Sequence, residues 1–213
     1  MADGSTFCIQ NSPAGTAAIG GGGGSLAYAG ITESAALALD LYNANPGGIQ
    51  FVSGGANPAG GTYTLATPVE FNYGHPINVT LQYNGQTLAV KLVDSFAPTN
   101  VFMTNMVIGP ISQYVGSDTG LIGFTGATGG VNSVQTISNF TYIPQPVLTA
   151  ALSGENIVVS WPAGVGGYVL QESSSLTNPS WTTVTNSVNG DGSNLQVTVP
   201  VAGGNQFFQL VLP

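Results

Sequence analysis

Residues 77–94 have the sequence INVTLQYNGQTLAVKLVD. Two runs rich in β-branched and apolar residues, Ile77–Tyr83 and Thr87–Asp94, flank the dipeptide Asn84-Gly85. Asn and Gly tolerate the positive φ angles that a two-residue hairpin turn requires. The stretch therefore predicts a β-hairpin.

Similar runs, bounded by Gly, Pro and Asn, occur along the whole chain, and no segment shows a long helical period with caps. We therefore predict an all-β fold, with one short helical turn at Pro110–Val115. The predicted strands before the proline-containing segment at 144–146 are Thr6–Gln10, Ala35–Tyr42, Ile49–Ser53, Ile77–Tyr83, Thr87–Asp94, Val101–Val107, Gly120–Phe124 and Ser133–Tyr142.

The segment Ile143-Pro144-Gln145-Pro146 predicts a domain boundary, because its two prolines cannot donate to a strand ladder. We expect one unit at residues 1–143, a linker at 144–146 and a second unit at 147–213. Short, closely spaced strands in the second unit predict a small β-sandwich with a spacer or anchoring role and its aromatic residues in the core. These strands are Val147–Leu152, Asn156–Trp161, Tyr168–Ser173, Trp181–Val184, Leu195–Val199 and Phe207–Val211.

Composition narrows the range of functions. Charged residues make up 5% of the 213 residues, against about a quarter in typical soluble domains, which favours a secreted β-protein at an extracellular or cell-surface location. Lys91 is the only Lys or Arg and the net charge is -8, so neither nucleic acid nor an anionic membrane is an expected partner. No apolar run is long enough to insert into a membrane, and Met1–Gly4 has no features of a signal peptide. Cys8, the single cysteine, is expected to be buried and inert.

Three segments together carry a family resemblance: Ala2-Asp3-Gly4 at the start, the glycine run Gly20–Gly24 leading into Tyr28, and Leu37–Tyr42. They resemble the L-type (legume-lectin-like) carbohydrate-binding domain, a concanavalin-like β-sandwich. Residues 79–90 and Ile122–Gly130 are similar to that family's central hairpin and its Gly-Phe-x-x-x-Thr-Gly segment, so the resemblance spans about residues 2–142. A complete domain of the family has strands before this point, which implies a sandwich that lacks its N-terminal strands.

Residues 147–213 carry a second resemblance, through the runs at Asn156–Pro162, Tyr168–Gln171, Trp181–Val184 and Asn205–Leu210. They resemble the small immunoglobulin- or fibronectin-type modules that close many secreted bacterial proteins.

The lectin resemblance implies one sugar site. In the family, the Asp of Ala-Asp-Gly follows a cis peptide bond and accepts hydrogen bonds from two sugar hydroxyls, and a glycine of the Gly-Gly loop donates a backbone N–H. These roles fall on Asp3 and on Gly23 or Gly24. The family's Asn is replaced by Ala44, and only the flanking Asn43 and Asn45 offer an amide. The specificity loop would be formed by Ala127, Thr128 and Gly129.

Two alternatives remain open for these residues from the sequence alone. Asp3 is equally well explained as an exposed, solvated carboxylate near the chain terminus. The glycine run Gly20–Gly24 has the composition of a flexible linker.

The family's metal site is largely missing. The Glu and Asn that would bind calcium and a transition metal are replaced by Ala38 and Ala44, and no acid or histidine lies between Asp40 and Glu70. Calcium takes six to eight oxygen ligands, of which Asp40 and the Tyr42 carbonyl would supply only a part. We therefore expect no cofactor and metal-independent binding, with Asp40 and Tyr42 as weak metal candidates.

Three functions follow, in order of preference. The first is extracellular glycan binding. The second is a structural subunit of an extracellular or cell-surface assembly, self-associating through an open sheet edge and completed by a neighbour's strands. The third is a glycoside hydrolase, but hydrolysis needs two carboxylates about 5–10 Å apart and no predicted strand carries such a pair. We therefore predict that the protein is not an enzyme, and we expect the only histidine, His75, to be a surface loop residue without a partner.

Overall fold

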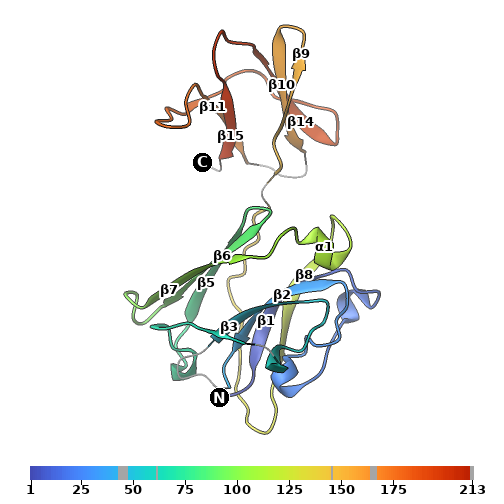
Figure 1. Cartoon of the computed structure of the whole chain (residues 1–213), viewed down its shortest axis with the longest axis vertical. Helices are drawn as coiled ribbons and strands as arrows, with labels where there is room; N and C mark the ends of the chain where they lie inside the picture. The colour runs from blue at the N-terminus through green and yellow to red at the C-terminus, as the bar shows by residue number, and fades with distance from the viewer. Residues whose placement is uncertain (43–47, 61, 145, 164–166, 212–213) are drawn as a thin grey trace. The chain divides into compact units, whose positions relative to one another are not determined.

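The computed structural model describes residues 1–42, 48–60, 62–144, 146–163 and 167–211. The chain divides into two compact units, Met1–Ile137 and Ser138–Pro213 (Figure 1). Antiparallel strands dominate both units, and the only α-helix in the described residues is the short α1 (Ser112–Val115). The all-β prediction is therefore confirmed. The predicted linker at 144–146 lies in the first part of the second unit.

The first sheet of unit 1 has the order β4-β3-β2-β1-β8, with every neighbouring pair antiparallel. Its strands are β1 (Gly4–Gln10), β2 (Ser34–Asp40), β3 (Gly48–Ser53), β4 (Thr64–Leu65) and β8 (Leu121–Ala127). In this register Gly4, the first residue of β1, lies opposite Asp40 on one side and Ala127 on the other. The start of β1 therefore meets the ends of both neighbouring strands.

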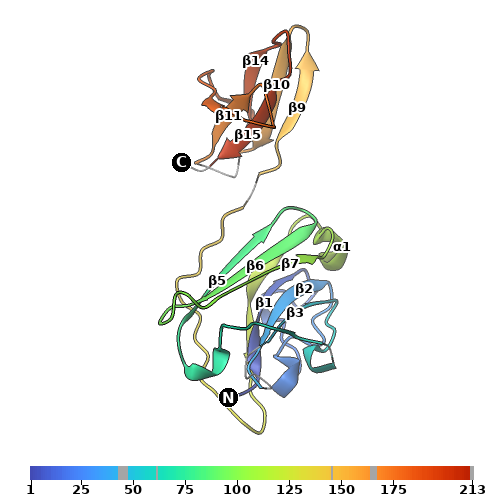
Figure 2. The ribbon, with the colours of Figure 1, turned by 60° about the vertical axis from the view of Figure 1, so that its left-hand side comes forward.

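The second sheet of unit 1 contains β5 (Ile77–Tyr83), β6 (Thr87–Asp94) and β7 (Val101–Val107). Their bounds match the predicted strands, and Asn84 caps the turn by accepting the backbone N–H groups of Gln86 and Thr87. The inward side chains Val90 and Leu92 of β6 pack with Leu37 of β2 in one core. Full burial of such a side chain stabilises the fold by about 1.5–3 kcal/mol. Figure 2 shows the two sheets as the two layers of a sandwich.

The other face of the first sheet is covered by the chain between β1 and β2. Leu26, Tyr28 and Ile31 of this segment pack against Cys8 and the small side chain of Ala36. Burial raises the pKa of the Cys8 thiol to about 11, and Cys8 is buried as predicted. This second core anchors the segment that contains two 3-10 turns, η1 (Gly15–Ala17) and η2 (Gly23–Ser25). The glycine run is thus part of a packed loop and not a flexible linker.

The strand predicted at Ser133–Tyr142 is wrong, because no strand occurs there and β8 is instead an edge of its sheet. Val134 and Ile137 in this segment are exposed, so its apolar alternation is not matched by a neighbouring strand in the described residues. An alternating sequence forms a strand only where a neighbour accepts its hydrogen bonds. β8 also runs to Ala127, beyond the predicted end at Phe124.

Unit 2 is a small sandwich of two sheets, β13-β14-β10-β9 and β12-β11-β15. Trp161 and Leu170 lie in its core together with valines of β10 and β14, so Trp161 has the predicted core position. The strands are β9 (Thr149–Ser153), β10 (Asn156–Pro162), β11 (Val169–Ser173), β12 (Thr182–Thr183), β13 (Asn189–Gly190), β14 (Asn194–Pro200) and β15 (Phe207–Val211). In the described parts of both units, no helix has the length and apolar character needed to cross a membrane.

Candidate functional site

Asp3 lies in the extended segment that leads into β1, and its peptide bond to Ala2 is cis. Its backbone N–H donates to the Ala127 carbonyl at 3.1 Å, and its carbonyl accepts from the Leu41 N–H at 2.8 Å. The Ser133 hydroxyl donates to the Ala2 carbonyl at 2.9 Å. Asp3 is only 6% exposed, so the alternative of a solvated terminal carboxylate is wrong. Neighbours from three parts of unit 1 hold it in place.

Two glycines frame the Asp3 carboxylate. A Cβ atom on Gly129 would lie 3.0 Å from Oδ2 of Asp3, and one on Gly23 would lie 3.3 Å from the same oxygen. Gly23 also has a φ of 60°, in the left-handed region that favours glycine. Its N–H donates to the Thr128 carbonyl at 3.2 Å, which joins the two glycine-containing loops. Any larger side chain at either position would crowd the carboxylate.

The Oδ2 atom of Asp3 is buried and has no hydrogen-bond partner among the described residues. A buried polar atom left without a partner costs about 1–3 kcal/mol. Such an atom, placed between two glycines, is an acceptor available to a small donor from outside the chain. A hydroxyl group fits this requirement.

Gly23 and Gly24, the two glycines that the resemblance offered as backbone donors, differ in whether their N–H groups are already hydrogen-bonded. The Gly23 N–H is engaged by Thr128, whereas no acceptor in the described part of the chain receives the Gly24 N–H. Gly24 packs closely on Ala59 of η3 (Pro58–Gly60), where an added Cβ would lie 3.0 Å from that side chain. Of the two glycines, Gly24 therefore has the free donor.

The residues that the resemblance assigns to a specificity loop lie beside Asp3. Ala127 ends β8 and is half-buried, whereas Thr128 and Gly129 are exposed beside the carboxylate. Asn43 and Asn45 lie outside the described residues.

Asp40, the last residue of β2, is half-buried near Asp3. Its Oδ1 accepts the Tyr42 N–H at 2.9 Å. Burial raises the pKa of Asp40, and the charge of Asp3 adds to this rise. Burial and the charge of Asp40 in turn raise the pKa of Tyr63. Asp40 is thus a hydrogen-bond acceptor at the end of β2. The carboxylate of Asp3 lies near it, and the predicted strands alone did not indicate this proximity.

The described residues around Asp40 do not include the ligands of a metal cage. In the described ranges, no group of three His, Cys, Asp or Glu side chains is close enough to hold an ion. Tyr42, whose backbone carbonyl was the other weak metal candidate, is 58% exposed.

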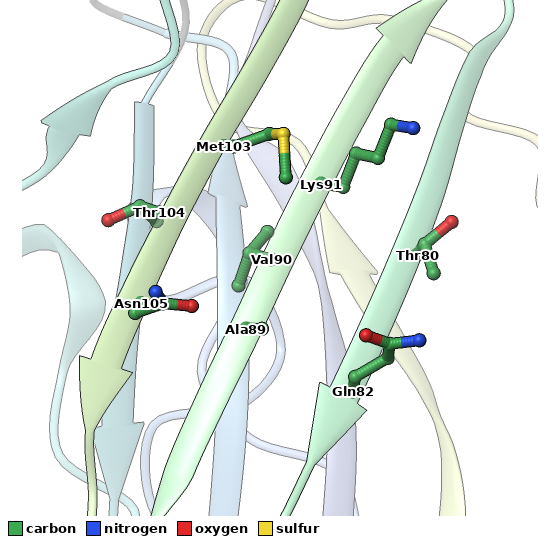
Figure 3. A pocket seen from close by; sticks show the side chains of 8 residues that line it. All are labelled: Thr80, Gln82, Ala89, Val90, Lys91, Met103, Thr104 and Asn105. Atoms are coloured by element: carbon green, nitrogen blue, oxygen red, sulfur yellow. The ribbon is translucent and has the colours of Figure 1, made fainter. Parts of the chain in front are cut away.

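A concavity lies on the outer face of the β5-β6-β7 sheet, away from Asp3 (Figure 3). It is an open groove of about 400 Å³. Its floor follows the strand register, with Thr80 opposite Lys91 and Lys91 opposite Met103. The full lining is Thr80, Gln82, Ala89, Val90, Lys91, Met103, Thr104 and Asn105. None of the predicted site residues lies in this groove.

The structure also reveals a pair that the sequence analysis missed. Nδ1 of His75 lies 2.9 Å from Oδ2 of Asp94, so the expectation that His75 has no partner is wrong. A signal was present in the predicted hairpin, because its register places Ile77 opposite Asp94. The segment before Ile77 must therefore pass beside the end of β6.

No known protein-family model matches the chain.

Proposed function

We propose that unit 1 is a concanavalin-like carbohydrate-binding domain of an extracellular protein, with Asp3 at the centre of its sugar site. The carboxylate of Asp3 accepts hydrogen bonds from sugar hydroxyls, the Gly24 N–H donates to the ligand, and the Thr128-Gly129 backbone borders the ring. The observation that carries this proposal is the buried, unpartnered Oδ2 atom of Asp3 between Gly23 and Gly129.

Saccharide chemistry suits this geometry. A sugar presents several hydroxyl donors on a compact ring, and a charged acceptor bond is worth about 1.5–3 kcal/mol. Glycines at the rim let the ring approach the carboxylate and the backbone closely. The site contains no Lys or Arg side chain that would select an anionic ligand, since Lys91 on the β5-β6-β7 face is the chain's only Lys or Arg.

Binding at this site is proposed to be independent of metal. The backbone around Asp3 is held by the hydrogen bonds from Leu41 and Ser133 and by the bond to Ala127. These bonds perform the positioning that an ion would otherwise supply. Chelation should therefore leave binding unchanged.

Hydrolysis is not proposed, although Asp3 and Asp40 lie close together. Asp3 is enclosed by glycines and Asp40 is committed to the Tyr42 N–H. A glycosidase needs its two carboxylates on either side of a scissile bond. A reducing-sugar assay run on the glycans that bind should show no turnover.

A second candidate function is self-association through β8. This strand ends its sheet, and Leu121 and Ile122 on it are 43% and 37% exposed. An open edge with apolar side chains is a template for strand addition. Sedimentation velocity over a concentration series tests it, and a monomer at all concentrations would exclude it.

For unit 2 we propose the role of an immunoglobulin- or fibronectin-like spacer.

A glycan array tests the main proposal. Wild-type protein should bind a defined set of glycans, with the same signal in EDTA. Asp3→Asn should lose that signal, whereas Asp118→Asn, the same chemical change at an exposed loop position, should keep it. Unchanged binding by Asp3→Asn, or no binding by the wild type, would refute the proposed site.

A further inference from the structure

A cluster of aromatic rings lies exposed on unit 1, at residues that the Asp3 site does not use. Tyr73, the last residue of η4 (Phe71–Tyr73), is 64% exposed, and Phe96 in the loop after β6 is 72% exposed. The ring of His75 lies between them, with centroid distances of 5.9 Å to Tyr73 and 4.9 Å to Phe96. Large apolar rings presented together to solvent are unusual on a surface without a binding role.

A buried carboxylate holds the imidazole of this cluster and the backbone at Phe96. Asp94 is 2% exposed, and its Oδ2 accepts from Nδ1 of His75 at 2.9 Å. Its Oδ1 accepts the backbone N–H groups of Phe96 at 2.8 Å and Ala97 at 3.2 Å. Asp94 therefore orients both the imidazole and the backbone that carries the Phe96 ring. A ligand would not have to order these groups on binding.

The same contacts determine which nitrogen of the imidazole can form a hydrogen bond with a ligand. Nδ1 is engaged by Asp94, so Nε2 is the ring nitrogen left for a ligand, and in a neutral ring with the proton on Nδ1 it is an acceptor. His75 is partly exposed, with 30% of its side chain accessible. The cluster thus combines ring surfaces with one oriented hydrogen-bonding atom.

The chemistry of the cluster selects a neutral saccharide. The C–H face of a pyranose packs on aromatic rings, and its hydroxyls donate to an acceptor such as Nε2 of His75. The single Lys or Arg of the chain, Lys91, lines the groove on the sheet face, so no Lys or Arg side chain recruits an anion here. Both rings are exposed to solvent and are available for stacking.

We propose that Tyr73, His75 and Phe96 form a second saccharide contact, separate from the Asp3 site. A sugar ring stacks on the two exposed aromatic side chains and donates a hydroxyl hydrogen bond to His75. Asp94 is the positioning residue of this contact and does not touch the ligand.

Affinity electrophoresis through gels that contain galactomannan, laminarin, xylan or mannan tests the proposal. The wild type should be retarded in at least one gel. Phe96→Ala should bind that polysaccharide about tenfold more weakly, as expected for loss of one aromatic contact. Phe96→Trp should restore binding, because a larger ring keeps the stacking surface. Tyr142→Ala, a change at an exposed tyrosine outside the cluster, should behave as the wild type.

The Asp3→Asn variant separates this proposal from the main one. If the two contacts are independent, Phe96→Ala should weaken polysaccharide binding by the same factor in the Asp3→Asn background. The single histidine gives a second readout, since its imidazole resonances in nitrogen-15 NMR spectra belong to His75 alone. These resonances should shift when an oligosaccharide derived from the polysaccharide that retards the wild type is added. Equal retardation of Phe96→Ala and wild type, no retardation in any gel, or a Phe96-dependent dimer in place of sugar binding would overturn the proposal.

Discussion

Replacing Asp3 by Asn should weaken sugar binding at the Asp3 site and at the same time stabilise the folded protein. The substitution keeps the shape of the side chain and removes its charge. In the wild type Oδ2 is buried without a partner, and the half-buried carboxylate of Asp40 lies nearby. Asn keeps an uncharged polar group at this position, so what is recovered is the extra cost of a buried charge beside the Asp40 carboxylate, part of a penalty of about 1–3 kcal/mol. We expect the free energy of unfolding to rise by about 1 kcal/mol.

Differential scanning calorimetry at pH 7 measures this effect on the transition of unit 1. A gain of about 1 kcal/mol corresponds to a rise in Tm of about 2–4 °C for a chain of this size. Sugar affinity should fall at least about tenfold, because a charged hydrogen bond is worth about 1.5–3 kcal/mol. Such opposition between stability and activity marks a functional residue. Asp118→Asn controls for the loss of one negative charge and should leave both quantities unchanged.

The same variant should change the ionisation of Asp40. The nearby charge of Asp3 contributes to the raised pKa of Asp40, so its removal should lower that pKa in a carboxyl-carbon NMR titration. A Tm that falls by several degrees in Asp3→Asn would refute the reasoning, since it would show that the carboxylate stabilises the fold and is not held ready for a ligand.

The other predictions concern separate features of the structure. Gly129→Ala should abolish sugar binding in a calorimetric titration with little change in Tm, since the added methyl would lie 3.0 Å from Oδ2 of Asp3; full binding would show that the glycine is not needed. Asp94→Asn should lower Tm at pH 7. Hydrogen bonds to Asp94 lower its folded-state pKa, the one from His75 contributing most, so this stabilisation is present above the ordinary pKa of about 4 and is lost as the pH falls through the lowered value. The Tm difference from wild type should therefore shrink in acid, and a constant difference would contradict this. Cys8, with a pKa raised to about 11 by burial, should not react with Ellman's reagent at pH 8 until guanidinium unfolds the chain; rapid reaction of the native protein would show that Cys8 is accessible.

Local sequence was sufficient for the elements whose contacts are local. The hairpin of β5 and β6 was predicted at its observed bounds, because the alternation and the Asn84-Gly85 turn lie within one stretch. Ser133–Tyr142 has similar alternation and is not a strand, because the presence of a neighbouring strand is not encoded in the stretch itself. The short strands β4 and β13 carry no pattern long enough to detect.

The candidate site depended on contacts between distant segments. Nothing in the spacing of Asp3, Gly23 and Gly129 shows that they meet; the family resemblance suggested it, and the structure brings the three together. The burial of Asp3 could not be predicted from the sequence either, because an exposed, solvated carboxylate explained the residue equally well. The pairing of His75 with Asp94 was within reach, because it follows from the hairpin register once the turn is placed.

The most direct test of the central claim is chemical-shift mapping by NMR, with the glycan that binds most strongly on the array as the probe. The proposed site predicts that titration perturbs the side-chain carboxyl of Asp3 and the amides of Gly24 and Gly129, and that Asp3→Asn abolishes these shifts. Perturbations confined to unit 2 or to the groove around Lys91, with Asp3 and Gly129 unchanged, would contradict the claim that the buried Asp3 carboxylate is the sugar acceptor.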